Sequence, residues 1–152
     1  MNVPHFEQEL SYSCLPACVR MVLAFWGHET SEKNLRILFK TRPAGTSPVK
    51  LLLQLPSLGF NATIHTASQS LLRQYLEAGF PCITHVDTEF LPHWSEGVIH
   101  AVVITAVDNE SVTLNDPSVT HGPLTVPLPN FLRAWASTDY LLVVIEPEQK
   151  FD

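Results

Sequence analysis

The 152-residue sequence has few basic residues and shows no cluster of them. Nine Lys and Arg stand against fifteen Asp and Glu, which gives a net charge of −6. A protein that binds a phosphate backbone needs a concentrated positive surface. The composition therefore argues against a nucleic-acid partner.

Cysteine is also scarce. The residues Cys14, Cys18 and Cys82 are odd in number and have none of the spacings of a secreted disulfide framework. A reduced, cytoplasmic location is the better prediction. The segment Met1–Gln8 lacks a basic stretch followed by an apolar core, so it does not predict a signal peptide.

Long apolar runs are absent as well. The longest uncharged apolar stretches are Met21–Trp26 and Ala101–Val107, far short of the roughly 20 residues that cross a bilayer. We therefore predict no membrane segment. The length fits one domain over residues 1–152, large enough to need no disulfide or metal for stability.

The first third of the sequence predicts helices. The run Leu15–Trp26 is apolar on nearly all sides and ends at Gly27, with Ser13 as its cap, which is typical of a central, buried helix. Two further helices are predicted, one capped by Thr30 or Ser31 and running to about Phe39, the other capped by Ser47 and running from Pro48 to about Leu58.

The later sequence predicts mainly strands. Runs rich in β-branched residues are broken by turn formers at Phe60–Thr66, Pro81–Val86, Val98–Val107, Ser111–Asn115 and Tyr140–Glu146. Short helices are predicted at Ser70–Glu77 and Asn130–Ala136, and a loop at Asp87–Gly97. Helices first and antiparallel strands later indicate an α+β fold.

Cys14 stands directly before the first predicted helix. A thiol at this position meets the positive end of the helix dipole and unpaired N–H groups, which favour the thiolate. The thiolate is the form that attacks carbonyl groups. Such chemistry also needs an imidazole base, a polar partner for the base and a donor to the oxyanion.

His100 and Asp116 are the candidates for the base and its partner. His100 begins one predicted strand, Asp116 follows the next, and a hairpin turn is predicted at 108–110. If the two strands pair through this turn, His100 falls opposite Asp116 or its neighbour. Both side chains then project from the same end of the sheet.

Gln8 lies on the irregular segment that leads into Cys14. An amide side chain beside the nucleophile can donate a hydrogen bond to the developing oxyanion, with the Cys14 N–H as the second donor. Gln8 is therefore the candidate oxyanion donor.

Together these residues resemble the bacteriocin-processing cysteine peptidases. The matching pieces are, in order, Gln8, the run Ser13–Val22 with Gly27 after it, His100-Ala-Val-Val, and Leu-Asn-Asp116-Pro117. The resemblance extends from Val3 to about Ile145. It implies a papain-like fold, in a family whose domains often precede an ABC transporter and cut leader peptides after a double glycine.

Carried over by motif, the resemblance implies roles for four residues. Cys14 attacks, His100 acts as general base and then acid, Asp116 orients His100, and Gln8 donates to the oxyanion. It also implies a peptide or leader-peptide substrate, an association with a separate ABC transporter, and no cofactor. The family usually has glycine at the position of Leu15, so we expect this residue to narrow the cleft or alter the backbone there.

Two other functions stay open from the sequence alone. The same residues can pass the acyl group to an amine or thiol, which would make the protein a transferase. The third hypothesis is a peptide-binding module that has lost its activity. Such modules generally lose the cysteine or the histidine, whereas Cys14 and His100 are both present.

The remaining reactive side chains have plainer interpretations. Cys18, one turn after Cys14, is read as a core thiol, with a resolving thiol as the alternative. Cys82 is read as core. Loop aromatics before His100 are expected either to line a groove or to pack beneath the loop (Phe90, Trp94). Several histidines lack the spacing of metal ligands, so no metal is predicted (His65, His85, His93, His121).

Overall fold

A computed structural model describes residues 1–149. In chain order the elements are α1 (Cys14–Phe25), α2 (Glu32–Phe39), α3 (Val49–Gln54), the 3-10 helix η1 (Leu55–Leu58), β1 (Phe60–Thr66), α4 (Gln69–Glu77), β2 (Cys82–Asp87), the 3-10 helix η2 (Thr88–Phe90), β3 (Ile99–Val107), β4 (Ser111–Asn115), β5 (Leu124–Pro127), α5 (Leu128–Ala136) and β6 (Leu141–Pro147). The prediction of one domain over 1–152 includes three residues outside the described part, and it stays a prediction.

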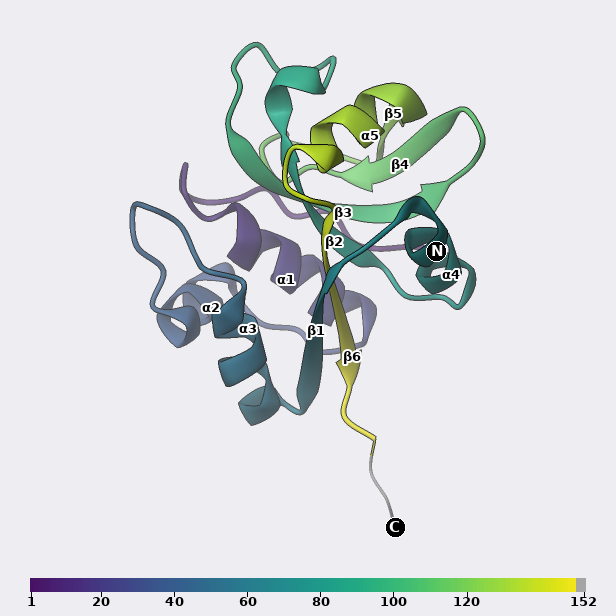
Figure 1. The fold of residues 1–152 in the computed structure, drawn as a ribbon. Helices are drawn as coiled ribbons and strands as arrows, with labels where there is room; N and C mark the ends of the chain where they lie inside the picture. Colours follow the sequence, from purple (N-terminus) through teal and green to yellow (C-terminus); the bar gives the residue numbers. More distant parts are fainter. Residues whose placement is uncertain (150–152) are drawn as a thin grey trace.

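The strands form a single sheet in which every neighbouring pair is antiparallel. Its order is β1-β6-β2-β3-β4-β5, so the last strand of the chain lies between the first two. Helices α1, α2 and α3 gather on one side of the sheet, and α4 and α5 lie apart from them (Figure 1). The sequence predicted this arrangement, in which helices come first in the chain and antiparallel strands follow.

Two hydrophobic cores separate along strand β3. Ala101 and Val103 belong to the core shared with α1, while Val102 and Ile104 belong to the core shared with α5. All four side chains are fully buried. A strand that is buried on both faces has apolar residues at successive positions. This explains the uninterrupted run of apolar residues after His100.

Helix α1 is the central helix that its composition predicted. Eight of its residues are buried, and it packs against β3. Ser13 occupies the cap position, but its side chain makes no capping hydrogen bond to the helix. The predicted capping role is therefore wrong, because the Ser13 hydroxyl lies within hydrogen-bond distance of Leu10 and Glu32 instead.

The β3–β4 hairpin has the turn predicted at 108–110. The Asp108 carboxylate accepts hydrogen bonds from the backbone N–H groups of Glu110 and Ser111 at 2.7 and 2.8 Å. The ladder runs to the pair Val103–Asn115, with one irregularity between Ile104 and Ala106.

The third helix forms over the predicted range, as α3 followed by η1, but two details of the sequence prediction were wrong. The Ser47 side chain does not cap this helix, since Pro48 holds the cap position. Strand β5 was missed. It is a four-residue edge strand preceded by Pro123 and ending in Pro127, and proline next to a short run is typical of a turn.

Candidate active site

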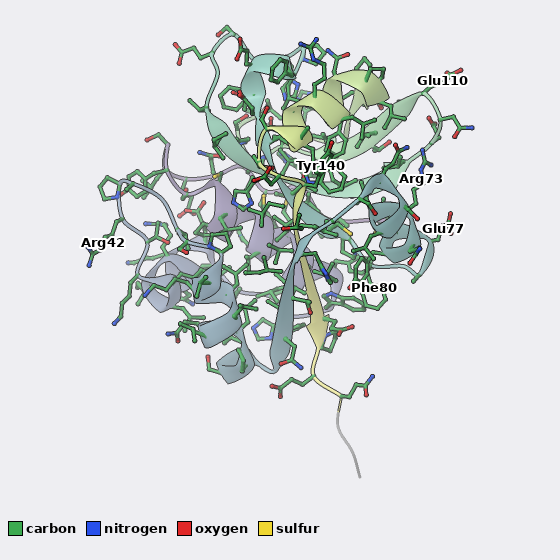
Figure 2. All side chains as sticks on the ribbon, in the orientation of Figure 1. Arg42, Arg73, Glu77, Phe80, Glu110 and Tyr140 are labelled. Carbon is green, nitrogen blue, oxygen red and sulfur yellow. The ribbon has the colours of Figure 1, made fainter. Side chains whose placement is uncertain are left out.

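Cys14 is half-buried at the first position of α1, where it lines a cleft of about 450 Å³. One wall comes from the segment between α2 and α3. Arg42, which projects outward from that segment in Figure 2, directly precedes the wall residues. The cleft is lined by Gln8, Ser11, Tyr12, Cys14, Pro43, Ala44, Gly45, Trp94, Glu96, Val98, Ile99 and His100.

The structure brings His100 between Cys14 and Asp116. The Nε2 atom of His100 lies 2.7 Å from Oδ1 of Asp116, and both side chains are buried. The imidazole also lies close enough to Cys14 for its hydrogen bonding and charge to lower the pKa of that thiol. Because Nε2 is engaged by Asp116, Nδ1 is the ring nitrogen left for the sulfur.

The charges of Cys14, His100 and Asp116 stabilise one another. Burial alone raises the pKa of the Cys14 thiol, but the hydrogen bond and charge of His100 and the N–H groups of Ala101 and Leu15 outweigh it, so the pKa is lowered. Burial lowers the pKa of His100, whereas Asp116 and Cys14 raise it to about 9. Both shifts therefore favour a thiolate beside an imidazolium.

Asp116 holds more than one partner. Its Oδ1 also accepts hydrogen bonds from the N–H and hydroxyl of Ser118, at 2.8 and 2.7 Å. Its Oδ2 lies 2.7 Å from His93 Nε2 and accepts a bond from Trp94 Nε1 at 2.9 Å. Burial raises the pKa of Asp116, but the bonds from His100, His93 and Ser118 hold it well below its ordinary value.

Trp94 lines the cleft, which is one of its two predicted positions, whereas His93 is a site residue to which the sequence analysis gave no role. The Trp94 ring also lies 4.9 Å from the His100 ring, at an angle of 57°, where it shields the imidazole from solvent. The available signal was their place in the loop directly before His100. Phe90, in the same loop, packs at the edge of the core beneath α5 rather than in the cleft.

Gln8 lies at the cleft, and its amide is held on one side. Its Nε2 donates to the Leu10 carbonyl at 2.7 Å, and its backbone N–H donates to the Pro117 carbonyl at 2.7 Å. An amide nitrogen carries two hydrogens, so the second remains free to donate into the cleft. The Oε1 atom is buried and has no partner among residues 1–149.

Two neighbours of Cys14 point into the protein. Cys18 is fully buried, and burial together with the charge of Cys14 raises its pKa well above the ordinary value, which makes it unreactive. Leu15 is 2% exposed in the α1 core and is absent from the described lining of the cleft. The expectation that Leu15 narrows the cleft was therefore wrong.

The other reactive residues are accounted for by packing. Cys82 is fully buried, as predicted, and burial raises its pKa to about 12.

Within residues 1–149, no three or more His, Cys, Asp or Glu side chains are grouped as a metal site would require. None of the helices in that part of the chain has the length and apolar character to cross a membrane.

A family model described as "Peptidase C39 family" matches residues 2–149. The chain belongs to the peptidase C39 family. That membership confirms the resemblance drawn from the sequence, and it makes the chain a cysteine peptidase, as predicted. None of the curated proteins compared with the chain matches it.

Three solved structures are similar over nearly the whole chain. A C39-like peptidase from Bacillus anthracis has a TM-score of 0.78 and 19% identity, covering 98% of this chain and 96% of that one. The peptidase domain of Streptococcus ComA, a bifunctional ABC transporter involved in quorum sensing, has a TM-score of 0.79 and 22% identity, covering 97% and 100%. A double-glycine-motif protease from an AMS/PCAT transporter, solved with a leader peptide, has a TM-score of 0.76 and 20% identity, covering 96% and 92%. The predicted papain-like α+β fold is confirmed.

Proposed function

We propose that this C39 peptidase cuts peptide bonds with Cys14 as nucleophile, His100 as base and acid, Asp116 as orienter and Gln8 as oxyanion donor. The observation that carries the proposal is the position of His100, whose Nε2 lies 2.7 Å from Asp116 and whose ring shares the cleft with Cys14. The lowered pKa of Cys14 and the raised pKa of His100 supply the charges that such a mechanism needs.

The reaction follows from that arrangement. The Cys14 thiolate attacks the scissile carbonyl carbon, and the carbonyl oxygen takes the negative charge. The free N–H of Gln8 and the Cys14 backbone N–H donate to this oxygen. Protonated His100 gives its proton to the departing amine, which leaves a thioester on Cys14. Neutral His100 then takes a proton from water, and the resulting hydroxide releases the carboxylic acid and restores the thiolate.

The proposed substrate is a leader peptide. The match with a double-glycine-motif protease in complex with a leader peptide, and with the peptidase domain of a transporter, supports this class of substrate. A separate ABC transporter is the corresponding candidate partner. The three cysteines are free, which fits the cytoplasmic location predicted from the sequence.

Cleavage of a synthetic leader peptide tests the proposal. Wild-type protein is incubated with a peptide containing a Gly-Gly site and with a matched peptide in which both glycines are alanine, and the products are identified by mass spectrometry. We expect cleavage after Gly-Gly by the wild type and none by Cys14→Ala. Cleavage by Cys14→Ala would contradict the proposed nucleophile, and products joined to an added amine would indicate acyl transfer.

A further inference from the structure

Glu32 is a buried carboxylate behind the active site. It is the first residue of α2 and is 1% exposed. Its Oε1 accepts the backbone N–H of Glu9 at 2.9 Å and the Ser13 hydroxyl at 3.0 Å, and its Oε2 accepts Arg36 Nε at 2.8 Å. Burying a carboxylate is costly unless it is paired and hydrogen-bonded, and here both conditions are met.

The bonds to Glu32 continue to the candidate oxyanion donor. The Ser13 hydroxyl that donates to Glu32 accepts the N–H of Leu10 at 3.0 Å. The Leu10 carbonyl in turn accepts the Gln8 side-chain N–H at 2.7 Å. Three hydrogen bonds, linked through the backbone of Leu10, therefore connect the Glu32 carboxylate to the Gln8 amide.

The direction of the Ser13 bond follows from its single proton. Both the Leu10 carbonyl and the Glu32 carboxylate lie 3.0 Å from the Ser13 hydroxyl oxygen. An ionised acceptor makes the stronger bond, and the Leu10 carbonyl already accepts Gln8. The proton therefore belongs to Glu32, and Ser13 remains free to accept from Leu10.

Helix α2 does not need this carboxylate in order to begin. Ser31 caps the helix by accepting the N–H of Asn34 at 3.0 Å. Glu32 at the first position could serve the helix dipole equally well from the surface. Its burial instead fixes the segment 8–13, which ends directly before Cys14 and so sets the direction of both the Gln8 amide and the Cys14 N–H.

We propose that Glu32 is the positioning residue of the oxyanion site. It acts through Ser13 and Leu10 on Gln8 and touches no substrate itself. The inference rests on the proposed function, because it assumes that Gln8 donates to the oxyanion. Its consequence is that loss of the carboxylate harms the step in which the oxyanion forms and leaves the Cys14–His100 pair intact.

The kinetics of Glu32→Ala test this. We expect kcat for peptide cleavage to fall by about 10- to 100-fold, somewhat less than the full loss of a donor, with KM changed by about twofold or less. Alkylation of Cys14 by iodoacetamide displaces iodide from a tetrahedral carbon and forms no oxyanion, so its rate and pH profile should match the wild type. Glu29→Ala, which changes an exposed acid three residues earlier, is the matched control and should cleave normally.

A double-mutant cycle separates positioning from general weakening. If Glu32 acts through Gln8, then Glu32→Ala should cost about threefold or less in a Gln8→Ala background, well below its cost in the wild type. Equal costs in both backgrounds would overturn the inference, as would a folded Glu32→Ala that cleaves normally or loses alkylation in parallel. If Glu32→Ala does not fold, Ser13→Ala breaks the same path and carries the same expectations.

Failure of the proposed function gives a different result. In that case Cys14→Ala would cleave, or Gln8→Ala would match the wild type. If both of those variants are impaired and Glu32→Ala is not, the function stands and only the role of Glu32 is lost.

Discussion

His93 and His100 share one carboxylate. The Nε2 atom of each ring lies 2.7 Å from a different oxygen of Asp116. The Asp116 oxygen that faces His93 also accepts a hydrogen bond from Trp94, which lies in the same loop as His93. The orientation of Asp116 toward His100 therefore depends on the loop before β3 as well as on the hairpin that carries the carboxylate.

Replacing His93 should weaken catalysis without disturbing the fold. The His93 side chain is 24% exposed and belongs to neither hydrophobic core, so His93→Ala leaves both cores intact. It removes one charge-assisted hydrogen bond while Trp94 remains, and we expect kcat/KM to fall about tenfold. His121→Ala, which changes an exposed histidine in contact with Thr120, is the control. Equal activity of the two variants would show that Trp94 alone suffices.

Asp116→Asn should be far more damaging than its small change in shape suggests. The carboxylate accepts bonds from Trp94 and Ser118 and holds His100, so an amide nitrogen placed on either side meets a donor rather than an acceptor. We expect kcat to fall by about 10²- to 10⁴-fold, because His100 loses its preferred tautomer. Steady-state kinetics measure this, and a loss below about threefold would exclude an orienting role.

The pairing of Cys14 with His100 should affect the pH dependence of both peptide cleavage and iodoacetamide labelling. The pKa of Cys14 is lowered and that of His100 is raised to about 9, so both shifts favour the thiolate–imidazolium pair. Peptide cleavage should decline as pH rises through about 9, where His100 loses the proton that the leaving amine needs. Iodoacetamide labelling should persist well below the pH at which an ordinary thiol reacts.

The matched variant for that measurement is His100→Ala. Without the imidazole, burial dominates at Cys14, and labelling should move to higher pH. Cys14→Ala controls for Cys18 and Cys82, whose raised pKa values make them inert. Identical profiles for the wild type and His100→Ala would contradict the pairing.

Leu15 should matter for stability rather than for substrate choice. Its side chain is 2% exposed, whereas Leu53 in α3 is 66% exposed. We expect Leu15→Ala to lower the free energy of unfolding by about 2 to 5 kcal/mol, and Leu53→Ala by about 0.5 kcal/mol or less. Urea unfolding measures the difference. A folded Leu15→Ala with altered preference for residues beside the cleaved bond would place Leu15 in the cleft after all.

His85 should contribute to instability in mild acid. Burial, with a smaller effect from the charge of His100, lowers its pKa to about 4 in the folded state, below the value of about 6.5 for an unfolded chain. The stability from neutral His85 is therefore complete above about pH 6.5 and is lost as pH falls toward 4. Urea midpoints at pH 7 and 4.5 should differ less for His85→Leu than for the wild type or for the exposed control His121→Leu.

The hairpin explains why part of the site could be predicted. The turn at 108–110 has an unmistakable polar composition, and strands of known spacing on either side of it bring His100 and Asp116 to the same end of the sheet. The helix after Cys14 has an equally strong apolar pattern. Local sequence patterns of this kind predict the end of the sheet at which a side chain lies as well as the type of element that carries it.

The residues that support the site carry no such signal. Glu32 and His93 act on Ser13 and Asp116 across separations of 19 and 23 residues. Neither occupies a periodic position, and neither can be assigned to the site from the sequence pattern alone. Their roles depend on tertiary contacts, which composition and spacing do not encode.

Strand β6 must be synthesised before the sheet that supports the site can close. Strand β6 pairs with β1 on one side and β2 on the other, so residues 141–147 fill the interior of the sheet rather than its edge. Until they leave the ribosome, β1 has no neighbouring strand to join it to β2, and the layer that supports α1 is open. Such long-range pairing forms late and slowly. A nascent chain that already contains Cys14, His100 and Asp116 but still lacks β6 is therefore a protease without a rigid site, and activity is withheld until β6 has joined the sheet.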